Sequence, residues 1–200
     1  MASPGDRKPL RPGLLEGASV LVGAGSAGPF AGEIERRLSE LGARVARVGT
    51  VTPVEGDAAA EEQLAEREVA RALETLGEAR LVAVDAAWSE GGEEELEQTM
   101  RLTWAVTRAA ANAAFLDPGR EGRIVLVAPG SGELAASAAA ALENLARTLS
   151  IEWARHGVTS VALAPGPQTG PGEVAEVVAY LASPAGAYLS GTLLDLRGSG

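Results

Sequence analysis

The sequence predicts an α/β domain built as a doubly wound parallel sheet of about six strands. Short apolar runs of strand length alternate with longer segments of helical periodicity. Apolar strands that alternate with helices form parallel sheets with helices on both faces. The expected strands are residues 18–22, 43–48, 81–84, 123–128, 158–163 and 192–196. The expected helices are residues 30–41, 58–76, 93–115, 134–155 and 172–181.

Composition excludes several classes of function. The chain has 200 residues with a net charge of −10, which argues against nucleic acid or an anionic membrane surface as a partner. It has no cysteine and one histidine, so disulfides and ordinary zinc sites are excluded. Residues 1–14 are polar and proline-rich, and we expect a flexible tail before a single domain at 15–200. Without a signal peptide or a long apolar run, we expect a cytoplasmic protein.

The connection after the second expected strand is unusually short. Only residues 49–56 separate that strand from the helix at 58–76. A parallel crossover needs roughly a dozen residues or more. We therefore expect the sheet to lack its third strand, or to keep a stub near 51–54. In a doubly wound fold this edge would hold the adenosine half of a dinucleotide.

A glycine-rich turn follows the first strand. Gly23, Gly25 and Gly28 form a G-x-G-x-x-G pattern, in which glycine lets the backbone approach a pyrophosphate at a helix N-terminus. The second strand ends in Arg47 and Gly49 without the acid that would accept ribose hydroxyls; Arg47 is either an exposed edge charge or a contact for a 2′-phosphate. Two interpretations stay open, namely nucleotide binding and a plain strand-to-helix turn.

Three segments resemble the short-chain dehydrogenase/reductase family, which has a Rossmann-like fold. They read LEGASVLVGAGSAGPF, EWARHGVTSVALAPG and PGEVAEVVAYLASPAGAYLSGTLLDLRGSG, and the resemblance covers nearly all of residues 15–200. In the register that it implies, Gly25 is the first phosphate-loop glycine, and the second and third are replaced by Pro29 and Ala31. The resemblance also places Asp57 where the family has an aspartate near adenine.

The same resemblance implies that the family's catalytic residues are absent. The tyrosine, lysine, serine and asparagine positions carry Ala135, Ala139, Pro129 and Arg101. The only lysine is Lys8, so no tyrosine is followed by a lysine four residues later. The family's substrate-covering loop is reduced to the few residues between Gly166 and the last helix. We expect no enzymatic activity from this chain alone and no bound cofactor.

The helices at 93–115 and 134–155 resemble the family's association surface, where two subunits form a four-helix bundle. Leucine spacings of three and four mark one apolar helical face, which either meets a partner or packs on the sheet. The expected interface residues are Met100, Trp104, Leu142, Leu145, Leu149 and Trp153. Our first hypothesis is a non-catalytic subunit that pairs with an active short-chain dehydrogenase/reductase, whose subunit would hold NAD(P); the alternative partner is a second copy.

Two other functions remain open at this stage. A former cofactor cleft with Asp85, Trp88, Arg101 and Ser131 would suit a non-redox cyclisation or isomerisation. The alternative is a structural role, in which Asp85 caps a nearby helix or forms a salt bridge with Arg101. We favour this alternative because no nucleophile–base pair is evident. The other function is a nucleotide-binding scaffold that forms a homodimer.

Overall fold

The computed structural model describes residues 10–24, 28–54, 57–87, 92–117 and 119–198. They form one six-stranded sheet in the order β2-β1-β3-β4-β5-β6, and every neighbouring pair is parallel. The strands are β1 Ser19–Ala24, β2 Arg44–Arg47, β3 Leu81–Asp85, β4 Gly122–Val127, β5 Val158–Pro165 and β6 Thr192–Leu196. The helices are α1 Ala31–Glu40, α2 Ala58–Leu76, α3 Glu93–Ala114, α4 Ala135–Glu152 and α5 Pro171–Ala182, with short 3-10 turns at Ala154–His156 and Pro184–Tyr188. The predicted fold class is confirmed.

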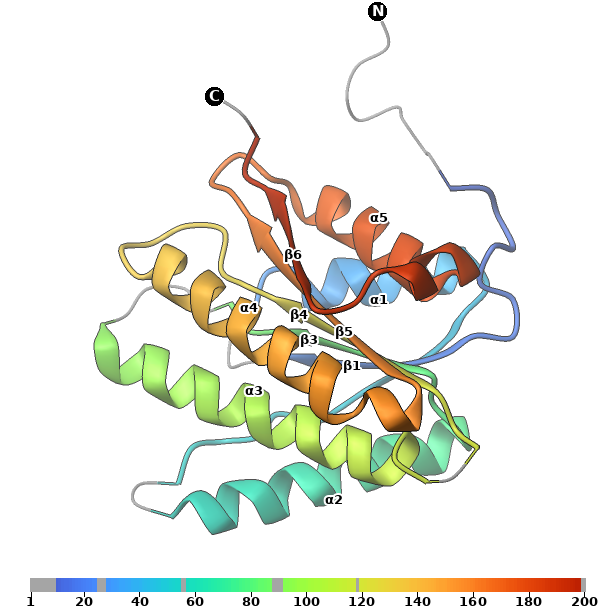
Figure 1. Cartoon of the computed structure of the whole chain (residues 1–200), viewed down its shortest axis with the longest axis horizontal. Coiled ribbons are helices and arrows are strands. Elements are labelled where there is room, and N and C mark those ends of the chain that lie inside the picture. The colour runs from blue at the N-terminus through green and yellow to red at the C-terminus, as the bar shows by residue number, and fades with distance from the viewer. Residues whose placement is uncertain (1–9, 25–27, 55–56, 88–91, 118, 199–200) are drawn as a thin grey trace, which may run out of the picture.

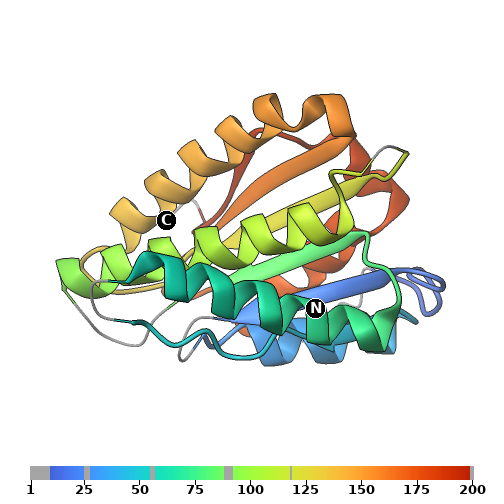
Figure 2. The same cartoon turned by 90° about the horizontal axis from the view of Figure 1, so that it is seen from below.

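The helices cover the sheet on both faces. Figures 1 and 2 show α2, α3 and α4 together on one face and α1 with α5 on the other. The core has two halves accordingly, one between the sheet and α2, α3 and α4, the other between the sheet and α1 and α5. All five residues of β3 are buried, as expected of a central strand that is apolar on both faces. Alternate residues of each inner strand thus serve the two halves of the core.

The edge of the sheet next to β2 is shortened as the sequence predicts. In the described residues no strand lies between β2 and α2, so β2 is the edge strand. The chain from Val48 to Val54 instead runs directly to α2, and Val51 is buried in the core. The backbone N–H of Val54 donates to the Glu61 carboxylate at 3.1 Å, which satisfies one polar group that a further strand would otherwise have paired.

The N-terminal boundary lies earlier than expected. Leu10 and Leu14 were placed in a flexible tail, but both pack against the α1–α5 half of the core. The Leu10 carbonyl also accepts a hydrogen bond from Arg37 at 3.4 Å. Arg37 is itself 7% exposed and pairs with Glu176 of α5 at 2.6 Å, so it joins three segments. The folded domain therefore begins before residue 15 and includes Leu10 and Leu14.

Substitution Gly122→Ala should destabilise the fold by about 1–3 kcal/mol, because a Cβ there would lie 2.2 Å from the buried Phe115 ring. Urea denaturation measures this free energy of unfolding. Gly172→Ala is the control: its added Cβ meets nothing closer than 3.8 Å, and alanine favours helix by up to about 1 kcal/mol. Equal stability of the two variants would contradict the packing of Phe115 on the start of β4.

Candidate functional site

The carboxyl edge of the sheet holds two adjoining cavities, which is where doubly wound proteins place their ligands. The first has a volume of about 230 Å³ and lies between the loops that follow β4 and β5. Its lining includes Pro129, Ser131, Glu133, Ala135, Ala139, Pro165 and Arg197. The second, of about 190 Å³, is lined in part by Pro29, Phe30, Ala87, Ser131 and Thr169. Among the described residues, neither lining contains tyrosine, lysine or histidine.

Three of the four positions that resemble catalytic positions come together at the first cavity. Pro129 follows β4, and Ala135 and Ala139 lie on the first turns of α4. None of these three side chains can exchange a proton. Arg197, which also lines the cavity, is engaged by Asp195 through two hydrogen bonds of 2.8 and 2.6 Å. That contact holds the pKa of the exposed Asp195 carboxyl at about 2.

The fourth position, Arg101, lies apart from this cavity on α3. Its guanidinium binds both Glu61 oxygens at 3.2 Å and Glu97 at 3.0 Å. Glu61 is 1% exposed, so Arg101 supplies the counter-charge for a buried carboxylate and ties α3 to α2. Arg101 therefore has a structural role in the contact between α2 and α3. The salt bridge between Arg101 and Asp85 that the sequence left open is not formed.

Asp85, at the end of β3, is fully buried and binds the start of α1. Its Oδ2 accepts hydrogen bonds from the backbone N–H groups of Phe30 at 2.8 Å and Ala31 at 2.9 Å. Its Oδ1 accepts from the N–H of Ala87 at 3.1 Å. The prediction that Asp85 caps a helix is confirmed. The carboxylate occupies the N-terminal N–H groups and the positive end of the helix dipole, which are the features that bind phosphate in this fold.

Two opposing effects act on the protonation of Asp85. Burial raises the pKa of its carboxyl, while hydrogen bonds from Ala87, Phe30 and Ala31 lower it, and burial is the larger effect. Both oxygens accept from N–H donors, so the geometry suits the ionised form. With no exposed surface, Asp85 does not face a cleft as a non-redox enzyme would require.

Gly28, the last glycine of the G-x-G-x-x-G pattern, lies directly beside this carboxylate. A Cβ at Gly28 would lie 2.2 Å from Asp85 Oδ2, so only glycine lets the turn pass beside it. Gly23 is a buried residue of β1, where a Cβ would meet Val106 at 3.1 Å. Gly25, the middle glycine of the pattern, and Trp88, assigned to the former cleft, lie outside the described residues. Packing against Asp85 is thus sufficient reason for Gly28.

The edge expected to hold adenosine is occupied by the chain's own side chains. Arg47 pairs with Glu35 at 2.9 Å on the surface. A Cβ at Gly49 would lie 2.1 Å from a Glu68 carboxylate oxygen, so α2 packs directly on the end of β2. Asp57, the candidate adenine contact, caps α2 by accepting from the Ala60 N–H at 2.9 Å. With Asp85 at the α1 N-terminus, these described residues are a poor fit to a dinucleotide.

The six expected interface residues divide into two groups. Leu142 and Leu149 are 0% and 2% exposed and belong to the core beneath α4, so their face of the helix packs on the sheet. Met100, Trp104, Leu145 and Trp153 are only partly buried against that core. The rings of Trp104 and Trp153 stack with centroids 6.3 Å apart and join α3 to the end of α4.

Two features of this part of the molecule, the positions of Phe30 and Glu61, were not predicted from the sequence. Phe30 is 3% exposed, and its ring lies near Gly130 at the second of the two carboxyl-edge cavities. Glu61 lies on the buried face of α2 with Ala65, Val69, Ala72 and Leu76, and that spacing is the signal that marks it as a buried acid. Within the described part of the chain, no cluster of three metal-binding side chains occurs, and no helix is long and apolar enough to span a membrane.

Replacement Asp85→Asn tests the protonation of this carboxyl. The pKa of Asp85 is raised from 3.8 in the folded protein. Between pH 3.8 and the raised pKa, the folded state therefore binds more protons than the unfolded state does. The stability due to Asp85 is then full below 3.8 and falls as pH rises through that window. Urea denaturation from about pH 4 to 7 should show the wild type losing free energy of unfolding relative to Asp85→Asn. The exposed Asp117→Asn serves as control. If the wild type instead gained free energy of unfolding relative to Asp85→Asn as the pH rises, the N–H donors would outweigh burial.

Comparison with known proteins bears on the fold alone. No protein-family model matches the sequence, and no curated protein is significantly similar to it. Among solved structures, a citronellol catabolism dehydrogenase (AtuB) of Pseudomonas aeruginosa PAO1 has 23% identity and a TM-score of 0.74, over 96% of this chain and 98% of that one. A short-chain dehydrogenase/reductase variant of Serratia marcescens has 24% identity and a TM-score of 0.71, over 90% and 96%.

A third similar structure contains a bound dinucleotide. The 3-ketoacyl-(acyl-carrier-protein) reductase of Brucella melitensis, in complex with NADH, has 21% identity and a TM-score of 0.69, over 92% of this chain and 98% of that one. The chain thus spans almost the whole length of these enzymes. Over the described residues it has the fold of the short-chain dehydrogenases/reductases.

Proposed function

We propose that this chain is a non-catalytic, degenerate member of the short-chain dehydrogenase/reductase family, which pairs with and supports an active subunit of that family. The observation that carries the proposal is the composition of the cavity at the carboxyl edge. Ala135 and Ala139 line it where the resemblance puts a tyrosine and a lysine, and Pro129 replaces the serine. Hydride transfer in this family needs a general acid next to the substrate carbonyl, and these three side chains have no proton to give.

The contacts of Asp85 at the start of α1, and the packing of Glu68 against Gly49 at the end of β2, support a chain without its own cofactor. A pyrophosphate at the α1 N-terminus would compete with a carboxylate that already accepts the Phe30 and Ala31 N–H groups. Two anions at one set of donors repel each other strongly in a buried setting. Any NAD(P) in the assembly would accordingly reside in the partner subunit. The dehydrogenase and reductase names of the similar structures suggest an oxidoreductase as that partner.

The outer surface of α4 supports pairing through the helices. Ile151 is 75% exposed there, an unusual exposure for a large apolar side chain. Most other exposed positions of α4 are small or uncharged, namely Ala136, Ser137, Ala140, Ala141, Asn144 and Thr148. Small side chains let a second helix approach closely. Trp104 and Trp153 lie partly exposed at the neighbouring junction of α3 and α4, and large aromatic residues often anchor interfaces.

Native mass spectrometry of the protein, purified gently from its own organism, tests the assembly. We expect the mass of this chain plus a second chain of dehydrogenase size. Fluorescence titration of the isolated chain with NADH and NADPH should show no saturable binding, whereas the intact complex should bind and turn over. A stable homodimer without affinity for any dehydrogenase-like chain would exclude the proposal, and so would hydride transfer by the isolated chain.

Substitution Ile151→Glu should weaken the pairing at least about tenfold, because it places a charge in the contact surface. Tyr180→Glu is the matched control: Tyr180 is a 39% exposed apolar residue on α5, across the sheet from α4. Sedimentation velocity of the reconstituted complex would measure both. Equal loss in the two variants, or none in either, would show that α4 is not the contact surface.

A further inference from the structure

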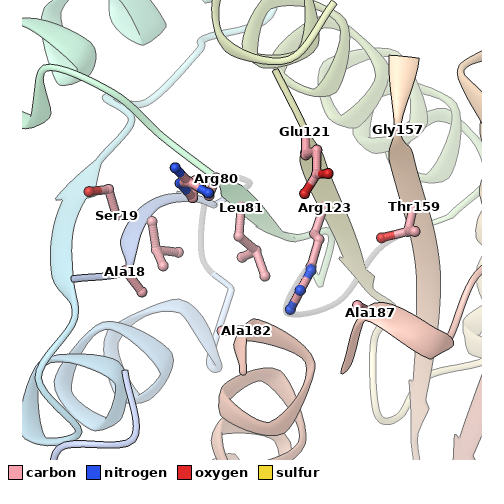
Figure 3. A pocket seen from close by; sticks show the side chains of 12 residues that line it. Ala18, Ser19, Arg80, Leu81, Glu121, Arg123, Gly157, Thr159, Ala182 and Ala187 are labelled. Carbon is pink, nitrogen blue, oxygen red and sulfur yellow. The ribbon is translucent and has the colours of Figure 1, made fainter. Parts of the chain in front are cut away.

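A separate cavity of about 290 Å³ opens at the amino edge of the sheet, opposite the carboxyl-edge site. It lies below the starts of β1, β3, β4 and β5 and is closed by the end of α5 and the turn after it. Figure 3 shows Arg80, Glu121 and Arg123 around it, with Ala182 and Ala187 on the facing wall. Its volume is at the lower end of the range of about 300–1,000 Å³ for small-molecule sites.

The arginines at this cavity differ from most others in the chain. Of the other arginines in the described residues, nine lie within 4.0 Å of a carboxylate, and Arg11, Arg44, Arg67 and Arg155 do not. Among the described residues, neither Arg80 nor Arg123 forms such a pair. In a chain of net charge −10, this cavity is lined by two guanidiniums and a single carboxylate, that of Glu121, and the net positive charge left would suit an external anion.

Arg123 supplies a rigid positive charge. Its guanidinium donates to the carbonyl of Leu181 at 2.7 Å and to that of Ser183, which are neutral acceptors at the end of α5. Burial lowers the pKa of Arg123, and the nearby Glu121 carboxylate opposes that effect. Arg80 differs in that it is exposed and has no hydrogen-bond partner for its guanidinium among the described residues. Arg80 is thus the group available to a ligand.

The rest of the lining restricts the ligand. Glu121 leaves two positive charges against one negative charge, which favours a single negative charge over a phosphate dianion. The apolar part of the lining consists of Ala18, Val20, Leu81, Ala182 and Ala187, of which Val20 and Leu81 are almost wholly buried. The Thr159 hydroxyl offers one further donor.

We propose that this cavity binds a small monocarboxylate with a short aliphatic chain. The carboxylate accepts the paired N–H groups of Arg80, whose planar guanidinium matches its two oxygens. The aliphatic chain lies along Ala182 and Ala187. This site is independent of the pairing proposed for α3 and α4, because it opens at the amino edge of the sheet and no residue of its lining belongs to either helix.

Titration of the full-length protein with hexanoate, followed by ¹H–¹⁵N NMR, tests the site. We expect saturable binding with a Kd of about 1 mM or tighter, and shifts concentrated at Leu81, Thr159 and Ala187. Hexanamide has the same shape without the charge and should bind at least about tenfold more weakly. Inorganic phosphate should also bind more weakly than hexanoate.

Variants of exposed residues separate the site from the fold. Arg80→Gln should weaken hexanoate binding at least about tenfold, and Ala187→Leu should block it by filling the cavity. Arg67→Gln, an exposed arginine of α2, should leave binding unchanged. Absence of saturation, equal binding of hexanamide, shifts at the carboxyl-edge cavity or unchanged binding by Arg80→Gln would each overturn the proposal.

Discussion

The hydrogen bonds from the start of α1 to the Asp85 carboxylate connect the centre of the sheet to the helix that follows β1. They place the turn before α1 against the end of β3, and that turn fits only because Gly28 has no side chain. Phe30, whose N–H makes the first of these contacts, places its ring near Gly130. An internal anion at the helix N-terminus satisfies the donors that an enzyme of this fold offers to its cofactor. That contact therefore fixes the start of α1 against the carboxyl end of β3.

The loss of catalysis that we propose lies at the carboxyl edge of the sheet, while the rest of the architecture is kept. The parallel sheet and its two core halves are complete over the described residues apart from the strand beyond β2. Only residues 166–170 connect β5 to α5, so nothing in that connection is long enough to cover a substrate. The helical layer is by contrast intact, with α2, α3 and α4 joined by Arg101–Glu61 and by the stacked tryptophans. Such a division would suit the supporting subunit that we propose.

The sequence was informative where local rules decide the structure. Alternating apolar runs predicted six strands, and the eight residues at 49–56 were too few for another crossover. The two partners of Asp85 at the start of α1 could not be predicted, because they lie 54 and 55 residues away and bind through backbone N–H groups that carry no side-chain signal. The apolar stripe of α4 was ambiguous for another reason. Leu142, Leu145 and Leu149 share one helical face, and only the packed sheet shows that two of them are buried and one is partly exposed.

The loss of a strand beyond β2 has a consequence for self-association. It leaves β2 with unpaired backbone groups on one side, the usual template for adding a strand from another chain. This edge is only four residues long and begins and ends with Arg44 and Arg47. Charged side chains and short length both discourage pairing between edges. Fibrous growth by sheet extension is thereby disfavoured, which agrees with the closed contact between helices that we propose.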